Sequence, residues 1–112
     1  MKIKTLNQER RPLDISEWND EVSAFIRSLN GFEQLVFNDY FLAFYDKSRS
    51  YEERLSAGFD AAKMALIMED GAPLLVDDDA EAMKNASVVP YYRLFNVALV
   101  NAGDELETAK KN

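Results

Sequence analysis

The chain has 112 residues, enough for one domain with one hydrophobic core. It contains no Cys and no His, which excludes disulfides, thiolate catalysis, Cys-ligated metal centres and every catalytic triad that uses an imidazole. Its 20 acidic and 13 basic residues leave a net charge of −7, a balance that disfavours nucleic acid and anionic membranes as partners. No apolar run is long enough for a membrane span or a signal peptide. We therefore expect a soluble, intracellular protein that is not an enzyme, uses no cofactor or metal ion, and binds other proteins.

The N-terminal segment, residues 1–14, is mostly polar. Pro12 disfavours a helix immediately before it, so we expect an extended or flexible arm, or a short strand. A helical domain is expected over residues 15–103, followed by a charged C-terminal tail over residues 104–112.

A first helix is predicted over residues 16–30, with Ser16 as its N-cap. Apolar residues recur there at spacings typical of one helix face, at Trp18, Val22, Phe25, Ile26 and Leu29. The pair Asn30-Gly31 is typical of the end of a helix.

The next segment, residues 32–46, is unusually rich in aromatic side chains, at Phe32, Phe37, Tyr40, Phe41, Phe44 and Tyr45. Its polar residues recur three to five positions apart, which predicts a helix with apolar side chains over most of its circumference. A single domain of this size rarely surrounds a helix completely. We therefore expect part of this aromatic surface to meet a partner or a second copy of the chain.

A third helix is predicted over residues 51–68, where apolar side chains repeat on one side. Gly58 weakens this helix locally but permits close packing against a neighbouring helix. The following segment, Glu69-Asp70-Gly71-Ala72-Pro73, is typical of a turn.

Two more helices are predicted, a short one over about residues 77–85 and a last one over residues 87–103. Ser87 is expected to cap the last helix, with Pro90 in its first turn, where a missing N–H is tolerated. The expected fold class is therefore all-α, a compact single-domain bundle of about five helices with an extended N-terminal arm.

The acidic run that begins at Asp77 has the composition of a calcium-binding loop. An EF-hand loop starting there would need Gly at its sixth position and Glu at its twelfth, where the chain has Ala82 and Val88. Acidic residues at the start of a helix, stabilised by the helix dipole, account for the run better. We expect no metal site.

Residues 60–103 follow a distinctive order of features. A helix ends in the turn Glu69-Asp70-Gly71-Ala72-Pro73-Leu74, an apolar pair follows, acidic residues begin a short helix, and Ser87 begins the next one. This order resembles the tail assembly chaperones of lambda-like phages, which have long, non-contractile tails. The resemblance implies a protein that binds the tape measure protein, keeps it soluble in the host cytoplasm and helps recruit tail tube subunits. It also implies a homo-oligomer that is absent from the mature virion.

In many members of that group, a programmed ribosomal frameshift makes a longer form whose extension contacts the tail tube protein. The codons for Lys110, Lys111 and Asn112 form an A-rich run, on which we expect an A-AAA-AAC-like slippery sequence. A run interrupted by G, or a closed −1 reading frame downstream, would contradict this expectation. Without the resemblance, these residues would be an ordinary charged tail.

The mechanism expected from the resemblance is the covering of apolar helix faces on the client by aromatic grooves. The candidate contact residues are Tyr40, Phe44, Tyr45, Tyr91 and Phe95. The alternative function is a small acidic inhibitor or DNA mimic that acts on a host nuclease. Mimicry of DNA needs carboxylates spread along one face, whereas the densest acidic residues here cluster at one turn and one helix start.

Overall fold

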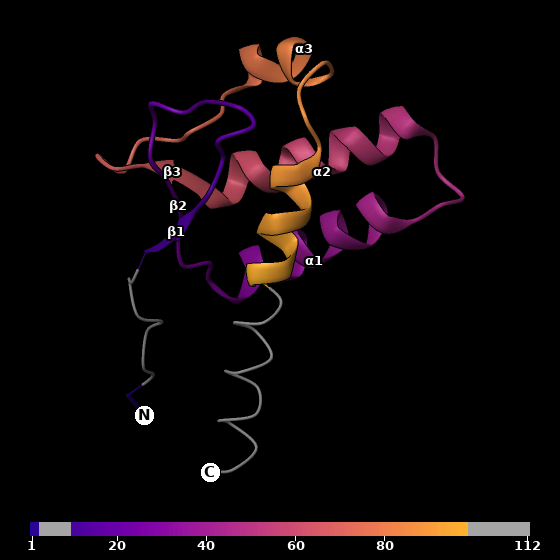
Figure 1. Cartoon of the computed structure of the whole chain (residues 1–112). Helices are drawn as coiled ribbons and strands as arrows, with labels where there is room; N and C mark the ends of the chain where they lie inside the picture. The colour runs from indigo at the N-terminus through magenta and orange to yellow at the C-terminus, as the bar shows by residue number, and fades with distance from the viewer. Residues whose placement is uncertain (3–9, 99–112) are drawn as a thin grey trace.

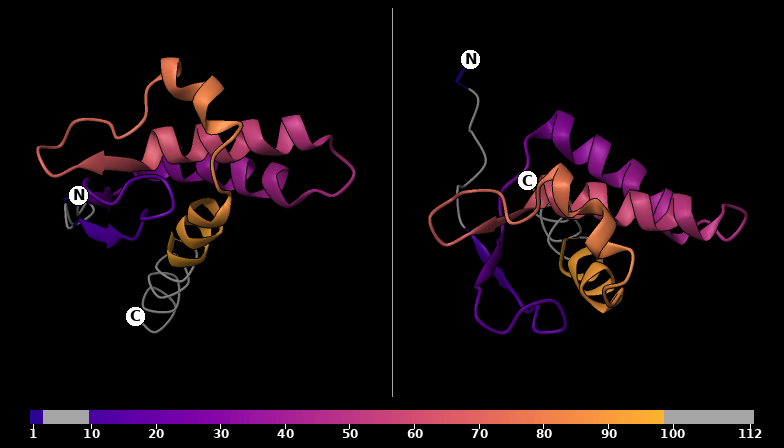
Figure 2. Two further views of the ribbon diagram at one scale, coloured as in Figure 1. Left: turned by 45° about the horizontal axis from the view of Figure 1, so that its top comes forward. Right: turned by 90° about the horizontal axis from the view of Figure 1, so that it is seen from above.

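The computed structural model describes residues 1–2 and 10–98 (Figure 1). The expected tail over residues 104–112, with the lysines encoded by the A-rich run, lies outside the described residues, as does the end of the last predicted helix. Two helices, α1 (Gly31–Tyr45) and α2 (Tyr51–Ala65), run side by side as an antiparallel hairpin. A further helix over residues 89–98 crosses one side of this hairpin (Figure 2).

A three-stranded sheet at one end of the hairpin shows that the all-α prediction is wrong. The strands are β1 (Arg11–Leu13), β2 (Ala24–Ile26) and β3 (Leu66–Met68), with β2 in the centre and both pairings antiparallel. Phe25 lies opposite Pro12 on one side and Ile67 on the other. Proline is compatible with the edge strand β1, because an edge strand leaves part of its backbone unpaired. The predicted N-terminal arm thus ends in a strand of the fold.

Residues 16–30, predicted to be helical, instead form a turn, strand β2 and an extended segment. The Asn19 side-chain oxygen accepts the backbone N–H groups of Glu21 and Val22, at 2.7 and 3.2 Å. Such side-chain bonds compete with helix formation. Ala24 and Ile26 are buried while Phe25 between them is half-exposed, an alternation that belongs to a strand.

The helix predicted over residues 51–68 ends at Ala65, and its last three predicted residues form β3. Leu66 pairs with Ile26 of β2, so pairing with the central strand begins at the residue after the end of the helix. The predicted turn after it is confirmed: Gly71 has φ +89°, and the Met68 N–H donates to the Ala72 carbonyl oxygen at 2.8 Å.

The short acidic helix is present as a 3₁₀ turn, η1 (Asp77–Asp79), followed by α3 (Ala80–Met83). The start of the last helix is also as predicted. The Ser87 hydroxyl accepts the Val89 N–H at 3.2 Å, and Pro90 lies in the first turn.

The core is one cluster of buried side chains from the hairpin, the sheet and the 89–98 helix. Its fully buried large side chains are Phe37, Leu66, Pro90, Tyr91, Leu94 and Phe95. Gly58 lets α2 lie close to the buried rings of Phe44 and Tyr91, in agreement with the close packing predicted at this position. A methyl group added at Gly58 would lie 3.0 Å from the Phe44 ring and 3.1 Å from the Tyr91 ring.

Candidate protein-binding surface

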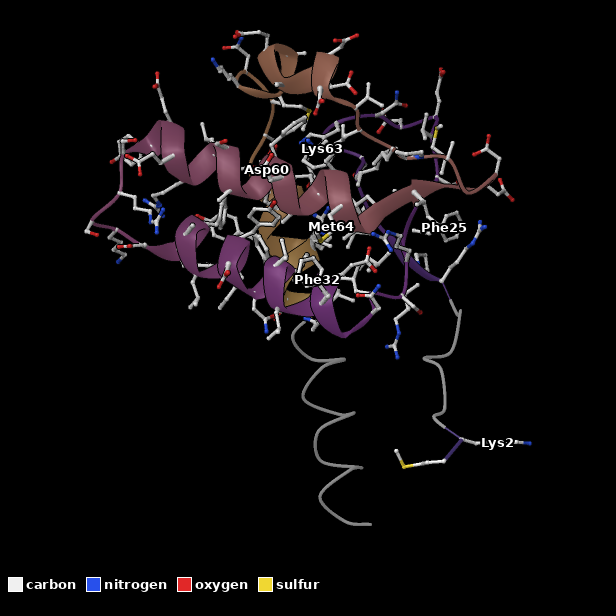
Figure 3. All side chains as sticks on the ribbon, turned by 180° about the vertical axis from the view of Figure 1, so that it is seen from behind. Lys2, Phe25, Phe32, Asp60, Lys63 and Met64 are labelled. Carbon is white, nitrogen blue, oxygen red and sulfur yellow. The ribbon has the colours of Figure 1, made fainter. Side chains whose placement is uncertain are left out.

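The outer face of α1 carries three large apolar side chains that are exposed to solvent. Phe32, Leu35 and Leu42 are 76%, 67% and 63% exposed, respectively. They are three and seven positions apart, which places them along one face of the helix, and we call them the α1 stripe. Figure 3 views the side of the hairpin opposite to the 89–98 helix and labels Phe32 near the start of α1. Apolar side chains gathered on one exposed helix face are typical of a binding surface.

The first turn of α1 is held by a capping box. The Asn30 side chain accepts the Glu33 N–H at 2.8 Å, and the Glu33 carboxylate accepts the Asn30 N–H at 3.0 Å. Arg27 donates to both carboxylate oxygens of Glu33. The hydrogen bonds from Arg27, followed by the one from the Asn30 backbone, lower the pKa of Glu33. This network fixes the helix start next to Phe32.

The inner face of α1 anchors the helix in the aromatic core. The Phe37 and Phe44 rings lie 5.4 and 5.2 Å from the Phe95 ring, centroid to centroid. The Phe41 ring, half-buried, lies 5.5 Å from the same ring. Because the inner face is packed in this way, the α1 stripe is preformed in the free chain.

The five predicted contact residues are distributed differently from the stripe. Phe44, Tyr91 and Phe95 are buried, at 3%, 1% and 0% exposure, and Tyr40 is half-buried. Tyr45 is 39% exposed and packs on the Phe44 and Phe95 rings. The structure therefore brings Phe44, Tyr45, Tyr91 and Phe95 together in the core layer, where Tyr45 is the member with substantial exposure.

The residues of the α1 stripe are not among the contact residues predicted from the sequence. The sequence indicates an excess of apolar side chains on this helix, and the predicted contact residues were chosen from the aromatic ones. The spacing of Phe32, Leu35 and Leu42 could have identified the stripe, since it places these residues on the face opposite to Phe37 and Phe44. Which of the two faces is covered depends on where the 89–98 helix packs.

Six of the 16 acidic side chains within residues 1–2 and 10–98 form ion pairs within the fold. Glu33 pairs with Arg27, and Asp77 pairs with Lys63 at 2.6 Å. The Asp79 carboxylate accepts the Val76 N–H at 2.9 Å, which caps the start of η1. The acidic run thus stabilises a helix start.

Within residues 1–2 and 10–98, no group of three or more acidic side chains is arranged to hold a metal ion. None of the helices in this part of the chain has the length and apolar character needed to cross a bilayer. Comparison with known proteins gave no match to a protein-family model, a curated protein or a solved structure.

Proposed function

We propose that this chain is a protein-binding chaperone whose α1 stripe covers the apolar face of a helical segment in a client protein. The exposure of Phe32, Leu35 and Leu42 on one face of a rigidly held helix is the observation that carries the proposal. Phe32, Leu35 and Leu42 occupy three of the four positions of an apolar seam with 3-4-3 spacing, the exposed Asp39 occupying the fourth, and they fit the apolar seam of an amphipathic helix on the partner.

The client we propose is a phage tape measure protein, in line with the resemblance of residues 60–103 to tail assembly chaperones. Such a client is long and helical and exposes apolar seams before assembly. In this proposal the chaperone acts in the host cytoplasm, helps recruit tail tube subunits and does not remain in the mature virion.

The size of the α1 stripe indicates weak binding at each site. Burying three large apolar side chains contributes roughly 5–9 kcal/mol. The loss of translational and rotational freedom on association costs about 4–15 kcal/mol. A single contact is therefore weak, and several copies along one client, or a self-associated form of the chaperone, gain strength through avidity. The net charge of −7 keeps the resulting complex dispersed.

The alternative, a DNA mimic that inhibits a nuclease, has less support. A mimic presents free carboxylates along one face, whereas six of the described acidic side chains, Glu17, Glu33 and Asp77 among them, are paired with basic side chains of the same chain. Its exposed apolar stripe would also serve no purpose on a charged nuclease groove.

The first test is the gene neighbourhood, followed by co-expression. The proposal predicts a tail tube gene upstream and a gene for a very long helical protein downstream. Co-expression of that long protein with this chain is expected to raise its soluble fraction after centrifugation. The double variant Leu35→Ser/Leu42→Ser is expected to abolish most of the gain, because both side chains are exposed and their replacement leaves the core intact.

The matched control is Val76→Ser, since Val76 is also an exposed apolar residue but lies outside α1. It is expected to keep the wild-type effect. Equal solubilisation by the wild type and the double variant, with both folded by circular dichroism, would refute the α1 stripe as the client site. Co-purification with a nuclease instead of the long protein would favour the alternative.

A further inference from the structure

A second surface, chemically different from the α1 stripe, lies at the end of the hairpin where α1 connects to α2. Two hollows adjoin there. The first, of about 500 Å³, is lined by Lys47, Arg49, Ser50, Tyr51 and Arg54, and we call it the basic hollow. The second, of about 250 Å³, is lined by Phe44, Tyr51, Arg54, Leu55, Val88 and Tyr92, and we call it the apolar hollow. Tyr51 and Arg54 line both, so the two hollows form one composite surface.

Arg54 is held in place between the hollows. Its Nε donates to the Phe44 carbonyl oxygen at 2.8 Å, and its guanidinium carbon lies 6.0 Å from the centroid of the Tyr51 ring. Its terminal nitrogens donate to no other group in the part of the chain that the structure describes. A preorganised guanidinium with free N–H groups is suited to binding a carboxylate.

The charges around the basic hollow are unusual for this chain. Its lining carries three bases and no acid, although the whole chain has a net charge of −7. Lys47 forms no ion pair with a described residue, while Arg49 is paired with Asp46 at 3.3 Å. On α2, Glu53 interacts with the helix start, where Ser50 Oγ donates to its carboxylate at 3.2 Å. The hollow therefore complements a negatively charged group.

The apolar hollow supplies contact area next to this charge. Tyr51 is 79% exposed, and Tyr92 and Val88 are also exposed beside it. The Tyr92 ring packs on the buried Phe44 ring at 5.1 Å, which gives the hollow a rigid floor. Tyrosine is a frequent anchor residue in protein interfaces, because its ring provides apolar area and its hydroxyl a hydrogen bond.

We propose that this composite surface binds a peptide segment of a partner protein in which an Asp or Glu stands beside a large apolar residue. The carboxylate is received by Arg54 and Lys47, and the apolar side chain enters the hollow between Tyr51 and Tyr92. A nucleic acid would also offer negative charge and flat rings, but its extended phosphate backbone is repelled by a chain of net charge −7. The proposal does not depend on the α1 stripe and adds a second binding site to the function proposed above.

A random peptide library selected against the full chain tests this proposal. The selected peptides are expected to be enriched in an acidic residue adjacent to Leu, Phe, Tyr or Trp, and their affinity is expected to fall as ionic strength rises. A selected peptide is then measured against variants by calorimetry. Lys47→Glu is expected to weaken binding about fivefold. Tyr51→Ser is expected to weaken it about tenfold or more.

Both substituted side chains are exposed, so the fold is expected to be retained, and circular dichroism checks this. The matched charge control is Lys2→Glu, which makes the same change far from the hairpin end (Figure 3) and is expected to leave the affinity unchanged. Leu35→Ser/Leu42→Ser is also expected to bind the peptide normally, which separates this site from the α1 stripe.

Three outcomes would overturn the proposal. The first is a selection without acidic enrichment. The second is a peptide whose affinity is unaffected by both Lys47→Glu and Tyr51→Ser. The third is displacement of the peptide by a single-stranded oligonucleotide, which would assign the surface to nucleic acid.

Discussion

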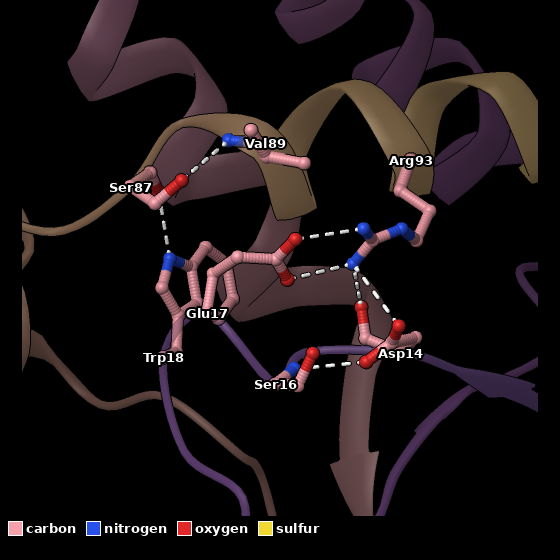
Figure 4. Close-up of polar contacts among 7 residues, drawn as sticks. All are labelled: Asp14, Ser16, Glu17, Trp18, Ser87, Val89 and Arg93. Carbon is pink, nitrogen blue, oxygen red and sulfur yellow. Dashed lines mark hydrogen bonds and ion pairs between the residues drawn. The ribbon is translucent and has the colours of Figure 1, made fainter.

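Arg93 and Glu17 form a two-point ion pair that ties the last described helix to the N-terminal part of the chain. Arg93 Nη1 and Nη2 donate to the two Glu17 carboxylate oxygens at 2.9 and 2.8 Å, across 76 positions of sequence (Figure 4). The same Nη1 donates to the Asp14 carbonyl oxygen. Beside it, Trp18 Nε1 donates to the Ser87 carbonyl oxygen at 2.8 Å. These hydrogen bonds hold the start of the 89–98 helix against the turn that precedes β2.

This pair predicts a specific pH dependence of stability. The hydrogen bonds from Arg93 are the main reason that the pKa of Glu17 falls from its ordinary value of 4.5 to about 2. Because the pKa is lower in the folded state than in the unfolded state, the pair stabilises the fold above about pH 4.5, and the stabilisation is lost as the pH falls towards 2. Glu17→Gln is therefore expected to be less stable than wild type at neutral pH, and the difference is expected to shrink over this range.

The measurement is urea unfolding at several pH values, followed by Trp18 fluorescence. Glu21→Gln is the control, because Glu21 is exposed and forms no ion pair with a described residue. A stability difference between wild type and Glu17→Gln that stays constant from neutral to acid pH would contradict the role assigned to the pair.

Gly58→Ala tests the close packing of α2 against the buried rings of Phe44 and Tyr91. Alanine favours the helix by about 1 kcal/mol over glycine. The added methyl group would, however, lie 3.0 Å from the Phe44 ring, which is buried among the rings of Tyr45, Tyr91 and Phe95. Overpacking of this kind costs about 1–3 kcal/mol. We expect a net decrease in the free energy of unfolding, measured by urea denaturation. An increase would show that the Phe44 and Tyr91 rings can move to make room for the methyl group.

Asn30→Ala tests the cap that positions the start of α1. The Asn30 side chain accepts the Glu33 N–H, and alanine cannot replace this bond. The expected loss is about 1 kcal/mol in the free energy of unfolding. Asn30→Asp is the matched control, since aspartate also caps helices and is expected to retain most of the stability. Equal losses in both variants would mean that the amide group acts in another way.

Phe37→Ala and Leu35→Ser test the assignment of the two faces of α1. Phe37 is 0% exposed, so its truncation is expected to cost about 3–5 kcal/mol in the free energy of unfolding. Leu35 is 67% exposed, so its replacement is expected to change stability by no more than about 0.5 kcal/mol. A large loss in Leu35→Ser would place Leu35 in a buried contact and would remove it from the proposed client site.

Residues 16–30, predicted to be helical, have a residue pattern that fits both a helix and a strand. The apolar spacing of Val22, Phe25, Ile26 and Leu29 satisfies a helix face and also contains the alternation of a short strand. The choice is made by the partners of β2, which come from residues 11–13 and 66–68. The residue pattern of 16–30 contains no information about these two strands, which lie on either side of β2 in the sheet. The same pairing converts Leu66 to Met68 from the end of a helix into β3.

Composition and spacing alone establish that this chain has no imidazole or thiol side chain, that α1 carries apolar side chains on nearly all sides, and that Gly58 permits close packing. These properties follow from composition and from spacing within one helix, which are local. Which of those side chains are buried depends on how the helices pack in the folded chain. The 89–98 helix packs on Phe37 and Phe44 and leaves Phe32, Leu35 and Leu42 in solvent. Because α1 is apolar on nearly all sides, its own sequence does not favour one face for burial, and the packing of the 89–98 helix, distant in sequence, determines which face is buried.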